Sequence, residues 1–304
     1  MIDLNALPLP RLFEALTADG SLDRLLAAAR REDFSDAGDV TTAAMPDGGR
    51  IVGAKGVGRM AGTVSGMVAI REILDAFDCH AELQTTVEDG APCGAGEVLW
   101  HLRGPIGPIL GVERTMLNIV GRMCGVATLT SKYVEAVSGT GCVVCDTRKT
   151  TPGLRAMEKY AVRCGGGTLH RAGLHDAVLL KDNHLVHLQP HELAGAVEEA
   201  STAARTRHDL RFVEVEVDDL VQFEKLLDCP EGVIDIILLD NFAPDQLREA
   251  VKLRDSRRSG LLLEASGGIV LERIGDVART GVDRISVGAL TQGVSSMDVS
   301  LEVQ

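Results

Sequence analysis

Aromatic side chains are scarce in this sequence, where one Trp, two Tyr and six Phe make up only 3% of the residues. Positive charge is also in the minority, because 31 Lys and Arg face 44 Asp and Glu, giving a formal net charge of -13. A nucleic-acid surface needs basic stripes with aromatic rings on which bases stack. The composition therefore argues against nucleic acid as a partner.

Long hydrophobic runs are missing as well. No apolar stretch approaches the roughly 18 residues of a membrane span, and the N-terminal MIDLNALPLP lacks a basic region followed by a hydrophobic one. The seven cysteines are an odd, scattered set without a disulfide framework. Cys142 and Cys145 form a C-x-x-C, but on a strand they point to opposite faces and cannot bind one metal ion. We therefore expect a cytoplasmic protein with buried thiols and no membrane attachment.

The first part of the chain, residues 1–112, carries patterns of a small α+β domain. A short helix is expected over residues 22–31, and apolar residues at helical spacing predict another within residues 66–77. A strand is expected near residue 51, and strand-like segments at 80–87 and 97–104 are joined by turn residues. This order predicts an open sandwich without a dense chemical motif of its own.

The second part, residues 113–304, begins with a long helical pattern over about 113–137 and then alternates between strands and helices. Six short apolar segments read as strands: 142–146, 177–181, 211–217, 235–240, 261–265 and 284–288. Such βα alternation requires a parallel sheet. The fold class is therefore α/β, with an incomplete C-terminal barrel of six or seven parallel strands. The last residues are candidates to pack back on the N-terminal domain.

Polar residues or glycine follow these strands at the ends where an α/β barrel builds its site. The same part of the chain gathers five basic or histidine residues between residues 148 and 181: Arg148, Lys149, His170, Arg171 and Lys181. A cationic cluster in an acidic protein indicates an anionic ligand. Arginine forks can bind carboxylates through two hydrogen bonds, so a carboxylated acceptor is expected here.

The later strands end differently. Glu216 and Asp240 supply hard oxygen ligands that suit Mg2+ together with a polyphosphate. The glycine-rich turns at residues 265–270 and 287–290 open helices whose free N–H groups can bind a monophosphate. The edge of the predicted sheet therefore combines a site for a carboxylated acceptor with a site for a magnesium-bound phosphorylated donor.

Several motifs occur in an order that resembles the quinolinate phosphoribosyltransferase family, the carboxylating nicotinate-nucleotide pyrophosphorylases. They are ERTMLN, GVATLT, DTRKTTPGLRAMEKYAVRCGGG, HR, KDNH, VEVEV, ILLDN, EASGGI and ISVGAL. The resemblance runs from about residue 33 to residue 300. It implies a two-domain homodimer that converts quinolinate and phosphoribosyl pyrophosphate into nicotinate mononucleotide, pyrophosphate and carbon dioxide, in NAD biosynthesis.

The same resemblance implies a role for individual residues. The acceptor's carboxylates would be held by Arg148, His170, Arg171 and Lys181, with Arg114 reaching into the neighbouring subunit's site. On the donor side, Lys149 would face the pyrophosphate, and Glu216 and Asp240 the ribose hydroxyls and Mg2+. The 5'-phosphate would bind to Ser266, Gly267 and Gly288.

The implied mechanism uses these groups in sequence. Oxocarbenium character develops at the ribose as pyrophosphate leaves, so Mg2+, Lys149 and nearby carboxylates stabilise the separating charges. The aligned ring nitrogen of quinolinate attacks the ribose and becomes positively charged. This charge makes loss of the adjacent carboxylate feasible. No decarboxylation cofactor is needed.

The sequence departs from the family pattern at Cys124, where Ser is common, and at Leu169, where Asn is frequent. LVHLQPH also replaces the usual small turn after KDNH. These changes affect the expected pocket shape and loop path more than the reaction type.

Other interpretations remain open at single positions. His170 could be a core histidine, Lys181 could form a structural ion pair, and Arg114 could be an exposed arginine near a helix start. For the whole chain, the alternatives are a same-fold relative from the molybdenum-transport-associated branch, a Schiff-base lyase using Lys181, and a non-catalytic binding module.

Overall fold

The computed structural model describes residues 2–189 and 191–304. These residues form two compact units, each built from several stretches of the chain. The parallel-sheet unit extends to Asn5 and includes Lys132–Lys149 and Gly167–Ala289, whereas the antiparallel-sheet unit comprises Ala6–Ser131, Thr150–Gly166 and Leu290–Gln304. The units are therefore not two consecutive halves of the sequence.

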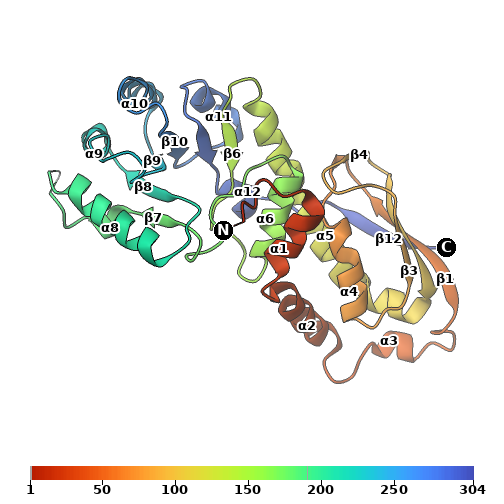
Figure 1. Cartoon of the computed structure of the whole chain (residues 1–304). Coiled ribbons are helices and arrows are strands. Elements are labelled where there is room, and N and C mark those ends of the chain that lie inside the picture. Colours follow the sequence, from red (N-terminus) through yellow and green to blue (C-terminus); the bar gives the residue numbers. More distant parts are fainter. Residues whose placement is uncertain (1, 190) are drawn as a thin grey trace. The chain divides into compact units, whose positions relative to one another are not determined.

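The parallel-sheet unit contains all six strands expected in the second part of the chain (Figure 1). They are β6 (Val143–Cys145), β7 (Val178–Leu180), β8 (Val213–Val217), β9 (Ile236–Asp240), β10 (Leu262–Ser266) and β11 (Arg284–Ser286). The sheet order is β6-β11-β10-β9-β8-β7, and every pairing is parallel. The predicted mixed α/β fold with a parallel sheet is confirmed.

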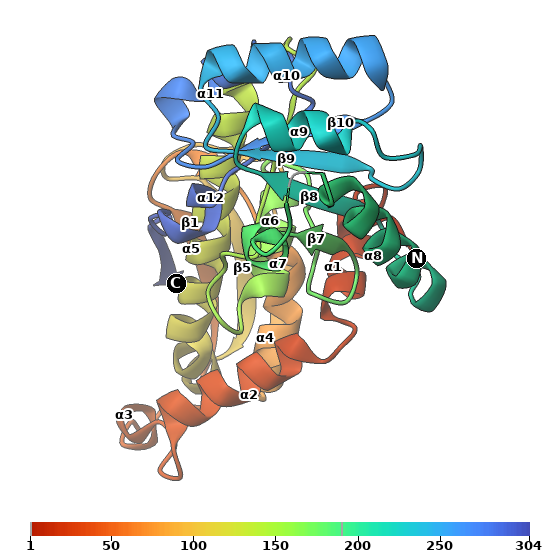
Figure 2. The same cartoon turned by 90° about the vertical axis from the view of Figure 1, so that its left-hand side faces the viewer.

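Helices follow most of these strands. They are α7 (Asp182–Leu185), α8 (Leu193–Arg207), α9 (Leu220–Leu226), α10 (Pro244–Arg257) and α11 (Leu271–Ala278). Helix α10 contacts both α9 and α11, and α8 contacts α9, so the helices form a continuous layer (Figure 2). Every position of β8 is buried, including those that alternate to the face away from α9. Glutamates within VEVEV therefore lie in the interior.

The antiparallel-sheet unit is organised around a four-stranded sheet of order β12-β1-β5-β3. Its strands are β1 (Ile51–Gly58), β3 (Glu82–Thr85), β5 (Val98–Pro105) and β12 (Val299–Val303), and β2 (Gly62–Thr63) pairs separately with β4 (Pro92–Cys93). The C-terminal strand pairs with β1, with Gly56 opposite Leu301. On β5, the fully buried Trp100 lies where a Cβ on Gly56 would meet its ring at 2.1 Å. Glycine is therefore required at that position.

Seven helical segments belong wholly to this unit or begin in it: α1 (Leu9–Thr17), α2 (Ser21–Phe34), α3 (Val40–Ala43), η1 (Met67–Ala69), α4 (Ile70–Ala76), α5 (Ile106–Ala136) and α6 (Arg155–Cys164). Helix α5 begins seven residues before the predicted start at residue 113. The early glycines and prolines suggested a connection, but a proline is compatible with a first helical turn because its missing N–H has no partner there anyway. A last short helix, α12 (Ala289–Gln292), follows β11.

The helices and the cysteines bear on what the sequence predicts about membranes and thiols. Within the described residues, no helix combines the length and apolar character needed to cross a membrane. All seven cysteines are buried and free. Buried thiols behave as small hydrophobic groups, as the sequence predicts.

Candidate active site

The carboxyl ends of the parallel strands bring most of the predicted site residues to one edge of the sheet. Lys181 directly follows β7, Glu216 lies in β8, and Asp240 and Ser266 end β9 and β10. Ser266 and Asp240 are paired in register, so these two groups start from neighbouring positions. The expected convergence at this edge is therefore present, although the ligand roles of the residues stay predictions.

An ion pair joins the basic and acidic sides of this edge. The ammonium of Lys181 donates a hydrogen bond to Oε2 of Glu216. The Lys181 side chain is 42% exposed and that of Glu216 is 10% exposed, so a ligand can reach the pair from the lysine side. Lys181 does form an ion pair, but its partner belongs to the predicted site.

Two arginines contribute to the basic side. Arg171 is buried and its Nη1 donates to the carbonyl of Ala177 at 3.4 Å, whereas Arg148 is half-buried. Burial lowers the pKa of Arg171, and the nearby positive charge of Arg148 lowers it further. Two guanidinium groups that repel each other in a partly desolvated place favour a bound anion.

His170 is buried, and both of its ring nitrogens contact groups of the chain. Its Nδ1 accepts a hydrogen bond from the backbone of Arg171 at 2.8 Å, so the proton of the neutral ring is on Nε2. Nε2 lies 2.8 Å from Oε2 of Glu214 and 3.5 Å from Oε1 of Glu264. The core-histidine interpretation and the ligand interpretation both remain compatible with this residue.

Glu214 and Glu264 are fully buried residues for which the sequence predicted no substrate or metal role, although Glu264 was expected near the end of its strand. Arg284 pairs with Oε2 of Glu264 through its Nε at 2.8 Å. His170 and the two glutamates are spaced closely enough to hold a metal ion. However, Arg284 already pairs with one carboxylate and the imidazole contacts both, so we interpret these four residues as a buried ion network. Glu214 lies within the VEVEV strand, but that alternation alone does not show that its glutamates are buried.

Charge within this buried ion network is unevenly distributed. Burial alone would lower the pKa of His170, but the negative fields of Glu264 and Glu214 outweigh it and raise that pKa above 6.5. Burial opposes ionisation of Glu264, yet His170 and Arg284 lower its pKa. Burial and the charge of Glu264 raise the pKa of Glu214. Glu264 is therefore the carboxylate that stays charged.

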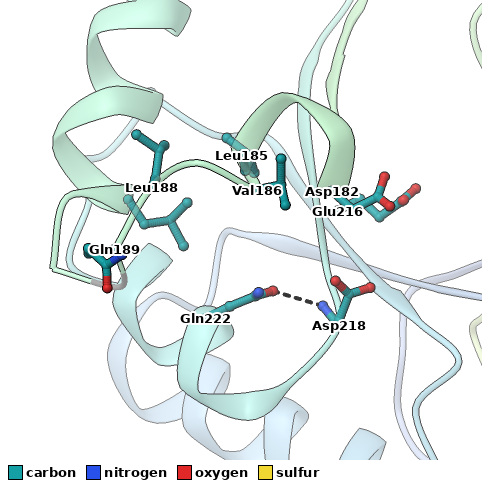
Figure 3. A pocket seen from close by; sticks show the side chains of 9 residues that line it. Asp182, Leu185, Val186, Leu188, Gln189, Glu216, Asp218 and Gln222 are labelled. Atoms are coloured by element: carbon teal, nitrogen blue, oxygen red, sulfur yellow. Dashed lines mark hydrogen bonds between the residues drawn. The ribbon is translucent and has the colours of Figure 1, made fainter.

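A cavity of about 230 Å³ opens beside the acidic side of the edge (Figure 3). Its polar lining includes Asp182, Glu216, Asp218 and Gln222, and its apolar lining comes from α7, the segment after it and the start of α8. In Figure 3, Gln222 points to Asp218 and its Oε1 accepts the Asp218 backbone N–H at 2.9 Å. Burial raises the pKa of Asp218, as do the charges of Asp182, Asp240 and Asp219. This crowding of carboxylates favours a cation.

The turn after β10 has the backbone geometry expected of a close-approach site. Gly267 has φ +94°, and a Cβ there would lie 2.1 Å from Oδ1 of Asn241. The Asn241 backbone N–H donates to the carbonyl of Ser266 at 2.9 Å, and its side chain donates to Asp240 at 2.7 Å. Asn241, which the sequence analysis did not single out, thus connects the predicted phosphate and metal residues.

The remaining predicted residues have these positions. Lys149 is exposed just after β6, and Gly288 is half-buried two residues after β11. Arg114 is exposed on α5 and belongs to the antiparallel-sheet unit. Its expected reach into a neighbouring subunit stays a prediction.

Comparisons with known proteins match this arrangement over nearly the whole chain. The family descriptions "Quinolinate phosphoribosyl transferase, N-terminal domain" and "C-terminal domain" match residues 39–124 and 126–302. The nicotinate-nucleotide pyrophosphorylase [carboxylating] of Mycobacterium leprae (strain TN) is 42% identical over 279 residues, which cover 90% of this chain and 94% of that protein. A probable enzyme of the same name from Bacillus subtilis (strain 168) is 38% identical, covering 81% and 82%.

A solved structure gives the same result. The nicotinate-nucleotide pyrophosphorylase from Francisella tularensis superposes with a TM-score of 0.84 at 33% identity, covering 100% of both chains. The two family domains together span most of this sequence, in the expected order. This chain therefore belongs to the quinolinate phosphoribosyl transferase family.

Proposed function

We propose that this protein transfers the phosphoribosyl group of phosphoribosyl pyrophosphate to quinolinate, releasing pyrophosphate and carbon dioxide and forming nicotinate mononucleotide. Family membership supports this reaction, as do the names of the relatives. The observation that carries it is the ion pair between Lys181 and Glu216. It places a cation suited to a diacid directly beside a carboxylate suited to the donor.

On the acceptor side, Arg148, Arg171 and Lys181 would hold the two carboxylates of quinolinate. Arginine forks bind carboxylates with defined geometry, and the repulsion that lowers the pKa of Arg171 is relieved by an anion. Fixing the dianion would aim its ring nitrogen at the ribose. Such positioning can lower the activation free energy by several kcal/mol, and by about 7 or more in the best cases. His170 would bind a carboxylate or position Arg171, whose backbone N–H its ring accepts.

On the donor side, the 5'-phosphate would bind at Ser266, Gly267 and Gly288. The left-handed backbone of Gly267 and the absence of a Cβ let main-chain N–H groups approach a phosphate closely. Lys149 would face the pyrophosphate, where its exposed position leaves it accessible to a large polyanion. These assignments separate the two phosphate ends of the donor along one sheet edge.

Magnesium is part of the proposal, with Glu216 and Asp240 as the residues that would hold it. Carboxylate oxygens are its preferred protein ligands, and burial together with the nearby charges of Asp182, Asp240 and Asp219 raises the pKa of Asp218. A bound divalent cation would neutralise charge on the leaving pyrophosphate. The carboxylates of Glu216 and Asp240 would also face the positive charge that develops on the ribose.

Decarboxylation then follows from the chemistry of the product ring. Once the ring nitrogen is bonded to the ribose it is positively charged, and this charge stabilises the electron pair left on the adjacent ring carbon when its carboxylate departs as carbon dioxide. A proton from water then bonds to that carbon and completes the product ring. The chain's contribution at this stage is to keep the ring in place through the remaining carboxylate. Arg171 is suited to that task because it is buried and held by the carbonyl of Ala177.

We also propose that the protein works as a homodimer in the cytoplasm. The resemblance of the ERT motif supports a role for Arg114 in a neighbouring subunit's site, and its exposure on α5 is compatible with such a contact. A Schiff-base lyase is less well supported, because the several cations expected around Lys181 suit binding of a dianion, whereas a nucleophilic amine needs only one such neighbour.

Incubation of the purified protein with quinolinate, phosphoribosyl pyrophosphate and Mg2+ tests the proposed reaction directly. Formation of nicotinate mononucleotide, detected by chromatography and mass spectrometry, is expected. A matched reaction with nicotinate in place of quinolinate should give far less product, since it offers only one carboxylate. Absence of product from quinolinate, or equal use of both acids, would overturn the proposal.

A further inference from the structure

A short extended segment lies beside β6, immediately before His170. Thr168 pairs with Cys145 in a parallel bridge, its N–H donates to the carbonyl of Val144 at 2.8 Å, and its carbonyl accepts from Asp146 at 3.1 Å. In extended backbone, the next residue turns its N–H and C=O to the other side. Leu169 therefore presents both groups away from β6.

The side chain of Asn5 binds both of these groups. Its Oδ1 accepts the Leu169 N–H at 2.8 Å, and its Nδ2 donates to the Leu169 carbonyl at 3.0 Å. The planar amide thus takes the place of a peptide group in a neighbouring strand. Leu169 is buried, so its polar groups need these partners. The backbone N–H of Asn5 donates to Oδ1 of Asp3 at 2.9 Å, which orders the turn that presents the amide.

The residues that follow Leu169 depend on its position. The His170 N–H donates to the buried Oδ1 of Asp146 at 2.7 Å, and the Arg171 N–H donates to the ring of His170 at 2.8 Å. Both hydrogen bonds extend from the backbone that directly follows Leu169, which the Asn5 amide holds. A displacement of about 1 Å at a binding group can cost about a hundredfold in rate.

We propose that Asn5 is a positioning residue for the acceptor site. Its two hydrogen bonds hold the backbone of Leu169 and thereby fix the positions of His170 and Arg171. This inference rests on the proposed function. Asn5 acts through the backbone and not on the substrate itself, so its loss should weaken acceptor binding more than donor binding. The donor residues Glu216, Asp240 and Ser266 lie on other strands, which do not depend on this contact.

Steady-state kinetics of Asn5→Ala and Asn5→Asp test the inference. Asn5→Ala removes both hydrogen bonds, and we expect the KM for quinolinate to rise about tenfold or more, with the KM for phosphoribosyl pyrophosphate changed less than twofold. Asn5→Asp keeps an acceptor for the Leu169 N–H but loses the donor, so a similar selective increase is expected. Asp3→Asn is the matched control, because it keeps an Oδ1 in the same turn and should behave as wild type.

Hydrogen exchange gives a second readout that does not require catalysis. In Asn5→Ala the amide of Leu169 should exchange at least tenfold faster than in wild type, while the amides of β8 keep their wild-type rates. Unchanged kinetics together with unchanged exchange would overturn the inference, as would equal increases in both KM values. If the wild-type protein makes no product, the proposed function fails. The exchange result then still decides whether Asn5 holds this segment.

Discussion

Lys181 and Glu216 form an ion pair at the carboxyl edge of the parallel sheet. The two residues come from different strands, and each was expected to bind a different substrate. In the protein without ligands, the lysine and the glutamate partly neutralise each other. If the proposed assignments hold, a diacid that binds Lys181 would compete with this ion pair and free Glu216 for the donor side.

Replacing Lys181 by Met should weaken quinolinate binding. The variant loses a charge-assisted hydrogen bond, which contributes about 1.5–3 kcal/mol, so the KM for quinolinate should rise roughly 10- to 150-fold. Lys252→Met is the control, because Lys252 is an exposed residue that pairs with Glu249 on α10. An unchanged KM in the Lys181 variant, measured by initial rates, would show that this lysine does not bind the acceptor.

Glu264→Gln should destabilise the fold. Glu264 is fully buried between His170 and Arg284, and removing one member of a buried ion pair costs about 3–5 kcal/mol because the other charge is left uncompensated. The free energy of unfolding in urea measures the loss. Glu249→Gln, which alters an exposed pair, should change that energy by about 0.5 kcal/mol or less. Equal effects of the two substitutions would contradict the buried ion network.

The raised pKa of His170 predicts a pH-dependent contribution to stability. Because the folded-state pKa lies above the unfolded value of 6.5, the contribution is complete below pH 6.5 and is lost as pH rises through the folded pKa. The stability difference between wild type and His170→Gln should therefore shrink as the pH rises above 6.5. Urea unfolding at several pH values measures it. A difference that grows with pH would show that the histidine is buried as the neutral ring.

The thiols of the folded protein should react slowly with Ellman's reagent at about pH 8. Burial raises the pKa of Cys124, Cys142 and Cys164 to about 12 and that of Cys229 to about 11, so little thiolate is present. Seven thiols should react rapidly once the protein is denatured. Absorbance at the thionitrobenzoate band follows both reactions, and a fast-reacting thiol in the native protein would be an unexpected result.

Gly267→Ala should impair use of the phosphorylated donor. The new Cβ would lie 2.1 Å from Oδ1 of Asn241 at a φ of +94°, so the turn after β10 must move. We expect kcat/KM for phosphoribosyl pyrophosphate to fall by about tenfold or more. Gly268→Ala is a close control, since Gly268 also has positive φ, +58°, but nothing lies within 4 Å of its Cβ position. A similar effect of both substitutions would point to backbone strain alone.

The positions of the parallel strands could be predicted from the sequence because short, doubly covered strands leave continuous apolar segments. Lys181, Asp240 and Ser266 follow from the same pattern, since a parallel sheet brings the carboxyl ends of its strands to one edge. Strand β12 was harder to predict. Its pairing with β1 joins residues almost at opposite ends of the chain, and nothing local in VSLEV specifies that partner.

Some elements were missed although local signals were present. Helix α1 carries a proline near its start, a common helix-start signal, but lies in a short stretch rich in Leu and Pro.

Glu214 could not be assigned from sequence alone, because a glutamate inside a strand usually points to solvent. Its place in the interior follows from the burial of every residue of β8, and its partners His170 and Glu264 come from distant segments. The Asn5 contact with Leu169 spans 164 residues and leaves no sequence signal.

A crystal structure with pyridine-2,3-dicarboxylate bound would show where the acceptor lies. We expect the ring at the carboxyl edge of the parallel sheet, with its carboxylates contacted by Arg148, Arg171 and Lys181. Binding of the diacid anywhere else, or at this edge without contact to those three side chains, would contradict this expectation.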